Sequence, residues 1–107
     1  MKITRSSGNV FADLGLPGVE ERLLKAQLAS QIARIIASRR LTQSAAAAIM
    51  GIDQPKVSHL VHGRLAGFSA ERLLTWLTEL GQDVDITVRT PARRRAGRLR
   101  VRMLAAG

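Results

Sequence analysis

Apolar residues recur at every third or fourth position through much of this chain, which is the spacing of one face of an α-helix. The longest such stripe covers residues 20–39 and consists of Leu24, Leu28, Ile32 and Ile35 or Ile36. Glutamates near the start of this segment and arginines at its end carry the charges that the helix dipole favours. The pattern therefore predicts a long amphipathic helix that buries the stripe.

Residues 41–63 predict two short helices joined by a tight turn. Thr42 can cap the first helix with its hydroxyl, and Gly51 supplies the permissive backbone where that helix ends. Asp53 can cap the second helix, whose first turn tolerates Pro55. The apolar face of this second helix consists of Val57, Leu60 and Val61. The opposite face is polar and contains Gln54, Lys56, Ser58, His59 and His62.

Two more helices are predicted on either side of these. Ser69 is a good N-cap and Gly81 a good stop for a helix whose apolar positions are Leu73, Leu74, Trp76, Leu77 and Leu80. At the other end of the chain, residues 10–14 predict about one helical turn that docks Phe11 on the domain. A partner-binding role for this short apolar patch is the alternative. Residues 1–9 are polar, and we expect them to be flexible.

Beyond residue 82 the apolar period changes from helical spacing to alternation. Val84, Ile86 and Val88 alternate with polar residues, which predicts a half-buried strand. Leu99, Val101 and Met103 alternate with arginines and could form a second strand, with a basic loop between the two. A lone hairpin on a small helical domain is marginal, so we expect residues 82–104 to pair between two copies of the chain.

The basic charge is concentrated at the C-terminal end. Up to Val88 the chain has ten basic and eight acidic residues, whereas from Arg89 onward it has seven arginines and no acid. Arginine clusters bind phosphate oxygens well. A solubilising tail and a DNA-contacting arm are equally good interpretations of this segment. Membrane binding is less favoured, because the segment lacks an apolar face rich in aromatic residues.

Composition argues against several other classes of protein. The 107-residue chain has no cysteine, so neither disulfides nor thiolate metal sites can form, and we expect a cytoplasmic location without a membrane partner. His59 and His62 lie at a spacing that suits a metal, but no third ligand accompanies them. Ser44, Ser58 and Ser69 lack a base and an orienting acid at any recognisable spacing. We expect neither catalysis nor a metal or cofactor.

The 42–62 segment resembles the helix-turn-helix of the XRE family, typified by phage lambda repressor and Cro. Gln43 opens the first helix, Ala47 sits where the helices cross, Gly51 occupies the turn, and Ile52, Val57 and Leu60 take the docking positions. The resemblance implies that Gln43 contacts a phosphate and braces Gln54. It also implies that Gln54, Lys56, Ser58 and His59 face base edges. We further expect His62 to approach a phosphate near the turn into Gly63, and Arg64 to bind DNA. Pro55 departs from the family pattern and removes one N–H that could meet a phosphate.

This resemblance predicts a mainly α fold: a compact five-helix, lambda-repressor-like domain over residues 10–81, followed by the C-terminal strand or hairpin. We expect a symmetric homodimer that binds double-stranded DNA, because such modules generally bind two half-sites. The wider layout also resembles the HigA-like antitoxins of toxin–antitoxin pairs, which repress their own operon and bind a RelE-like toxin. The alternative is a protein-interaction module that neutralises a toxin and binds DNA only weakly.

Overall fold

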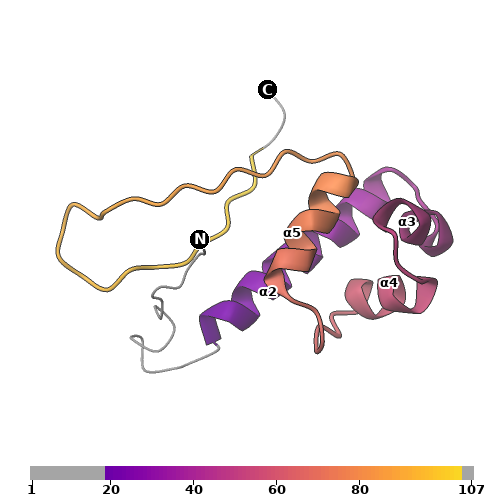
Figure 1. Cartoon of the computed structure of the whole chain (residues 1–107), viewed down its shortest axis with the longest axis horizontal. Helices are drawn as coiled ribbons and strands as arrows, with labels where there is room; N and C mark the ends of the chain where they lie inside the picture. Colours follow the sequence, from indigo (N-terminus) through magenta and orange to yellow (C-terminus); the bar gives the residue numbers. More distant parts are fainter. Residues whose placement is uncertain (1–18, 105–107) are drawn as a thin grey trace. The chain divides into compact units, whose positions relative to one another are not determined.

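Four helices lie within residues 19–104, the part of the chain that the structure, a computed structural model, describes (Figure 1). They are α2 (Val19–Ser38), α3 (Gln43–Met50), α4 (Gln54–Val61) and α5 (Ala70–Glu79). Each begins and ends close to its predicted boundary, which confirms the mainly helical fold. The chain divides into two units. Lys25–Asp85 holds most of α2 and all of α3 to α5, and the second unit's described residues are 19–24 and 86–104.

Three helices begin at the predicted caps. The hydroxyl of Thr42 accepts a hydrogen bond of 3.0 Å from the backbone N–H of Ala45 at the start of α3. Asp53 and Ser69 make the same type of bond at the starts of α4 and α5, at 3.1 and 3.2 Å. An N-cap depends only on residues three positions apart, so it can be predicted from sequence.

The core of the Lys25–Asp85 unit is made from one face of each helix. α3 packs against α4 and α5. The largest of the fully buried side chains are Ile32, Val57, Leu60, Leu73 and Leu80. In α2 both Ile35 and Ile36 are buried, so this helix buries a wider stripe than one isoleucine alone would give.

Trp76, one of the apolar positions of the predicted helix, is a core residue, and only 4% of it is exposed. The ring of Phe68 meets it edge-on, with 5.5 Å between the ring centroids. The guanidinium carbon of Arg72 lies 5.3 Å from the centroid of the Trp76 ring, in cation–π geometry. The indole is thus contacted by Phe68 from the loop before α5 and by Arg72 from α5 itself.

Two hydrogen bonds join α2 to distant parts of the same unit. The ammonium of Lys25 donates to the carbonyl of Phe68 at 2.8 Å. The guanidinium of Arg39 donates to the carbonyl of Leu80, at the C-terminal end of α5, at 3.1 Å. A cation at this position satisfies a carbonyl that the helix leaves free and is favoured by the helix dipole. Both ends of α5 are thereby tied to α2.

The predicted C-terminal strand and hairpin are wrong for the single chain. Between residues 82 and 104 the backbone forms no strand, and Figure 1 draws it without an arrow. Ile86 is 67% exposed and Val88 is 91% exposed, so these two apolar side chains are not packed against the rest of the described chain. An isolated two-stranded hairpin is marginal in water, and here its loop would carry several like charges.

The fifth predicted helix, at residues 10–14, and the flexible segment 1–9 lie outside the described residues. The described structure thus contains four of the five expected helices.

Candidate nucleic-acid interface

α3 and α4 form a helix-turn-helix because small residues let them approach and Gly51 turns the chain between them. Ala46 and Ala47 in α3 are buried, at 0% and 5% exposure. Gly51 has a φ of 73°, in the left-handed region that glycine tolerates, and its N–H donates to the carbonyl of Ala47 at 2.8 Å. Three residues separate the two helices, and the last of them, Asp53, is the N-cap of α4.

α4 buries one side and exposes the other. Val57 and Leu60 are 0% and 1% exposed and point into the core. At about 100° per residue, the polar positions cover the opposite half of the helix, from Gln54 at one margin to Lys56 at the other. Of these polar side chains Ser58 is half-buried, and the exposed ones are Gln54, Lys56, His59 and His62.

A side-chain hydrogen bond joins the starts of the two helices. The amide Nε2 of Gln54 donates to Oε1 of Gln43, eleven residues earlier. Within residues 19–104, Gln54 therefore keeps one N–H and its own Oε1 free, and Gln43 keeps both of its N–H groups free. A free donor beside a free acceptor on one planar amide matches the N7 acceptor and N6 donor of adenine.

His62 is held by the helix on which it lies. Its Nδ1 lies 2.7 Å from the carbonyl oxygen of Ser58, so Nδ1 carries the proton and donates. In a neutral ring Nε2 is then an acceptor, which repels a phosphate, whereas a protonated ring offers Nε2–H as a donor. His62 is therefore suited to a phosphate contact only as an imidazolium.

Arg64 follows the end of α4 and is exposed. Its backbone N–H donates to the carbonyl of His59 at 2.8 Å, which fixes the turn after the helix. The structure thus places Arg64 and His62 at the C-terminal end of α4, while Gln43, Gln54 and Lys56 lie at the N-terminal ends of α3 and α4. The predicted residues fall into two groups on the same pair of helices.

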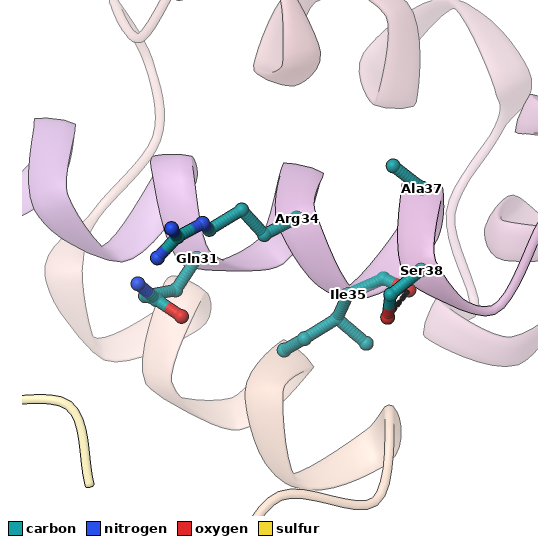
Figure 2. A pocket seen from close by; sticks show the side chains of 5 residues that line it. All are labelled: Gln31, Arg34, Ile35, Ala37 and Ser38. Carbon is teal, nitrogen blue, oxygen red and sulfur yellow. Dashed lines mark hydrogen bonds between the residues drawn. The ribbon is translucent and has the colours of Figure 1, made fainter. Parts of the chain in front are cut away.

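An open hollow on α2 offers no chemistry of its own. Figure 2 shows its lining residues Gln31, Arg34, Ile35, Ala37 and Ser38, all from this helix. The Ser38 hydroxyl donates to the carbonyl of Ile35, and Arg34 is the one charged side chain in this lining. Across the described ranges no three histidine or acidic side chains gather closely enough to hold a metal ion.

Comparison with known proteins agrees with this geometry. Residues 10–89 match the model of a family described as "Helix-turn-helix domain". The chain belongs to this family. One solved structure, named "Putative XRE Family Transcriptional Regulator", is 49% identical, with a TM-score of 0.77 over 84% of this chain and 100% of that chain. No curated protein matches. The fold is therefore an XRE-type helix-turn-helix.

Arg40 is a further candidate that the sequence analysis treated only as a helix-end charge. It is exposed and has a φ of 54°, and it stands three residues before Gln43. Its N–H donates to the carbonyl of Ala37, and the N–H of Leu41 donates to that of Ile36, both at 3.0 Å. These two bonds form a Schellman motif, in which glycine is the usual residue at this position. The sequence alone did not reveal this unusual arginine, because its position relative to the end of α2 is known only from the structure.

Proposed function

We propose that this chain is a sequence-specific regulator that binds double-stranded DNA through α3 and α4. The observation that carries the proposal is the hydrogen bond between Gln54 and Gln43, at the start of an α4 whose outward face is polar. It holds the Gln54 amide with a donor and an acceptor free on an exposed helix of the width that the major groove admits. The 49% identical relative is named as a transcriptional regulator, which supports the same role.

In this proposal the residues divide into those that position the protein and those that select the sequence. Gln43, Arg64 and His62 contact phosphates and set the register of α4 in the groove. Gln54 binds an adenine edge through two hydrogen bonds, and Lys56 donates to guanine acceptors. Ser58 and His59 contact neighbouring base edges. The function is binding, and no step of it calls for catalysis.

We extend the proposal to a symmetric homodimer, supported by the exposed apolar residues after α5. Two copies of residues 83–89 paired antiparallel about Ile86 put Val84 opposite Val88 and Asp83 opposite Arg89. Apolar and opposite-charge cross-strand pairs of this type each stabilise a sheet by roughly 0.2–1 kcal/mol. The pairing would cover Ile86 and Val88, which are exposed in the single chain, and would give two α4 helices for half-sites about 34–36 Å apart.

The dimer is tested with Val88→Lys, which changes a side chain that is 91% exposed and so leaves the folded monomer intact. We expect sedimentation to show a dimer for the natural chain and a monomer for the variant. Thr87→Lys, on the opposite face of the same segment, is the control. A dimer of unchanged stability in Val88→Lys would refute the strand pairing.

DNA binding is tested by fluorescence anisotropy on the DNA upstream of the protein's own gene and on scrambled DNA. We expect binding at least about a thousandfold tighter to the upstream DNA. Gln54→Ala should cost about 1–3 kcal/mol at the matched site and relax the preference at one base pair. Gln27→Ala, which removes an exposed glutamine from α2, is the matched control and should change neither quantity. Equal affinity for both DNAs would refute the proposal.

Autorepression and the antitoxin role are finer predictions that depend on the resemblance to HigA-like antitoxins. They require a RelE-like toxin gene beside this one whose product arrests growth when expressed alone. Co-expression of the present chain should relieve that arrest. If no such gene adjoins, the regulator acts without a toxin.

A further inference from the structure

The segment after the helical unit carries a dense set of cations that the proposed function has not used. We call residues 89–102 the arginine arm. Half of its fourteen positions are arginine, and none is acidic or lysine. The arginines are Arg89, Arg93, Arg94, Arg95, Arg98, Arg100 and Arg102. All seven side chains are exposed.

The positive charges of the arm act on one another. Within residues 19–104, the one side-chain hydrogen bond of the arm is donated by Arg95 to the carbonyl of its neighbour Ala96, at 3.0 Å. Partial desolvation and the positive charges of Arg98, Arg89 and Arg100 lower the pKa of the Arg95 guanidinium. Like charges repel one another, and an anionic partner that binds between them relieves that repulsion.

The choice of arginine and its spacing indicate which anion. Arginine presents a planar fork of donors that matches phosphate oxygens, whereas lysine is a point charge. Arg98, Arg100 and Arg102 alternate along the chain, so in extended backbone they would lie on one side at intervals of about 6.6–6.8 Å. A DNA strand has one phosphate for about every 3.4 Å of helix axis. Arginines spaced at about twice this interval could therefore each contact a different phosphate.

The arm also lies beyond the domain that defines the family. The family match ends at residue 89, where the arm begins. Six of the seven arginines therefore lie outside the segment that matches the family. A polybasic segment attached to such a domain is brought to duplex DNA whenever α4 binds, at the high effective concentration that a short connection gives.

We propose that the arginine arm binds the phosphate backbone of the same duplex DNA to which α4 binds. This inference rests on the proposed function, which delivers the arm to DNA. The arm supplies affinity without sequence preference, because phosphate contacts do not distinguish bases. Single-stranded RNA and acidic lipid surfaces also present phosphates, and they are the other possible partners of the arm.

The test measures the salt dependence of binding by the full chain to upstream and scrambled duplex DNA. Two arm variants, R94Q/R95Q and R98Q/R100Q, each remove two charges. The matched control, R22Q/R34Q, removes two exposed charges from α2. Each phosphate that a variant no longer neutralises should lower the slope of log affinity against log salt by about 0.9. A variant that leaves two phosphates without their arginines therefore reduces the affinity change between 50 and 200 mM salt by about 12-fold.

We expect at least one arm variant to lower this slope by more than the control while the ratio of upstream to scrambled affinity stays constant. Slopes that fall no further than in the control would overturn the inference. A larger effect of the arm variants on single-stranded RNA, or on phosphatidylcholine–phosphatidylserine vesicles, would also overturn it and assign the arm to that partner. If the natural chain binds upstream and scrambled DNA equally, the proposed function is refuted. The inference about the arm is not refuted by that result, because the arm variants would still lower the slope of log affinity against log salt.

Discussion

Replacing Arg40 by glycine should stabilise the fold although it removes a charged side chain. Arg40 is the one non-glycine residue with a positive φ among residues 19–104, at 54°. It occupies the Schellman position after α2, fixed by the 3.0 Å bonds from its own N–H to Ala37 and from Leu41 to Ile36. Its side chain is exposed, so the substitution removes little packing.

The size of the effect follows from two opposing quantities. An L-residue in the left-handed conformation costs roughly 1–2 kcal/mol, which glycine avoids. Glycine in turn makes the unfolded chain more flexible, which costs about 0.4–1 kcal/mol. The difference lies between about 0 and 1.6 kcal/mol. Its midpoint gives Arg40→Gly a gain of about 0.8 kcal/mol, or a rise in Tm of about 3–6 °C for a domain of this size. Arg40→Ala keeps the backbone strain and should stay within about 0.5 kcal/mol of the natural chain.

Far-UV circular dichroism measures the Tm of both variants during heating and their free energy of unfolding in urea. The same two variants separate the effect of backbone strain on DNA binding from the effect of the Arg40 charge, because both remove the charge and only Arg40→Gly relieves the strain. If Arg40 contacts a phosphate, both should lower affinity for upstream and scrambled DNA equally and reduce the salt slope by about 0.9. A glycine variant no more stable than the alanine variant would refute the assignment of strain to Arg40.

Three further variants test the core and the interface. Leu73→Ala should destabilise by about 2–5 kcal/mol in urea unfolding, because Leu73 is 0% exposed and leaves a cavity; a destabilisation under about 1 kcal/mol would contradict the described core. Ala47→Leu should cost about 1–3 kcal/mol where α3 meets α4, with Ala48→Leu, on the exposed side, as a near-neutral control. In a double-mutant cycle on upstream DNA, Gln43→Ala and Gln54→Ala should couple by about 0.5–3 kcal/mol; additive effects would mean that the hydrogen bond does not assist binding.

Local signals in the sequence determined the helices. Thr42, Asp53 and Ser69 cap the helices as predicted, because each cap involves a backbone N–H only three residues away. The apolar stripe of α2 was correct for the same kind of reason, since helical spacing alone places residues on one face. Trp76 was assigned to the core from its position within such a pattern.

Strand formation could not be settled in this way. The alternation of Val84, Ile86 and Val88 predicts a strand, but a strand also needs a partner to satisfy its N–H and C=O groups. No partner pairs with this segment in the described part of the single chain, and Val88 is left 91% exposed. The same residues would form a strand only where a second chain supplies the missing hydrogen bonds.

The contacts that shape the candidate site were decided by tertiary structure. The resemblance to the XRE family predicted that Gln43 braces Gln54, and the hydrogen bond between them is present. Residue types and spacing alone did not predict it, because the turn at Gly51 is what brings the two amides together. Arg39 was assigned to the dipole of its own helix, whereas the fold directs it to the carbonyl of Leu80, 41 residues away. Local hydrogen bonding and periodicity thus fix where helices begin, end and face, while the partners of a long side chain depend on which helices pack together.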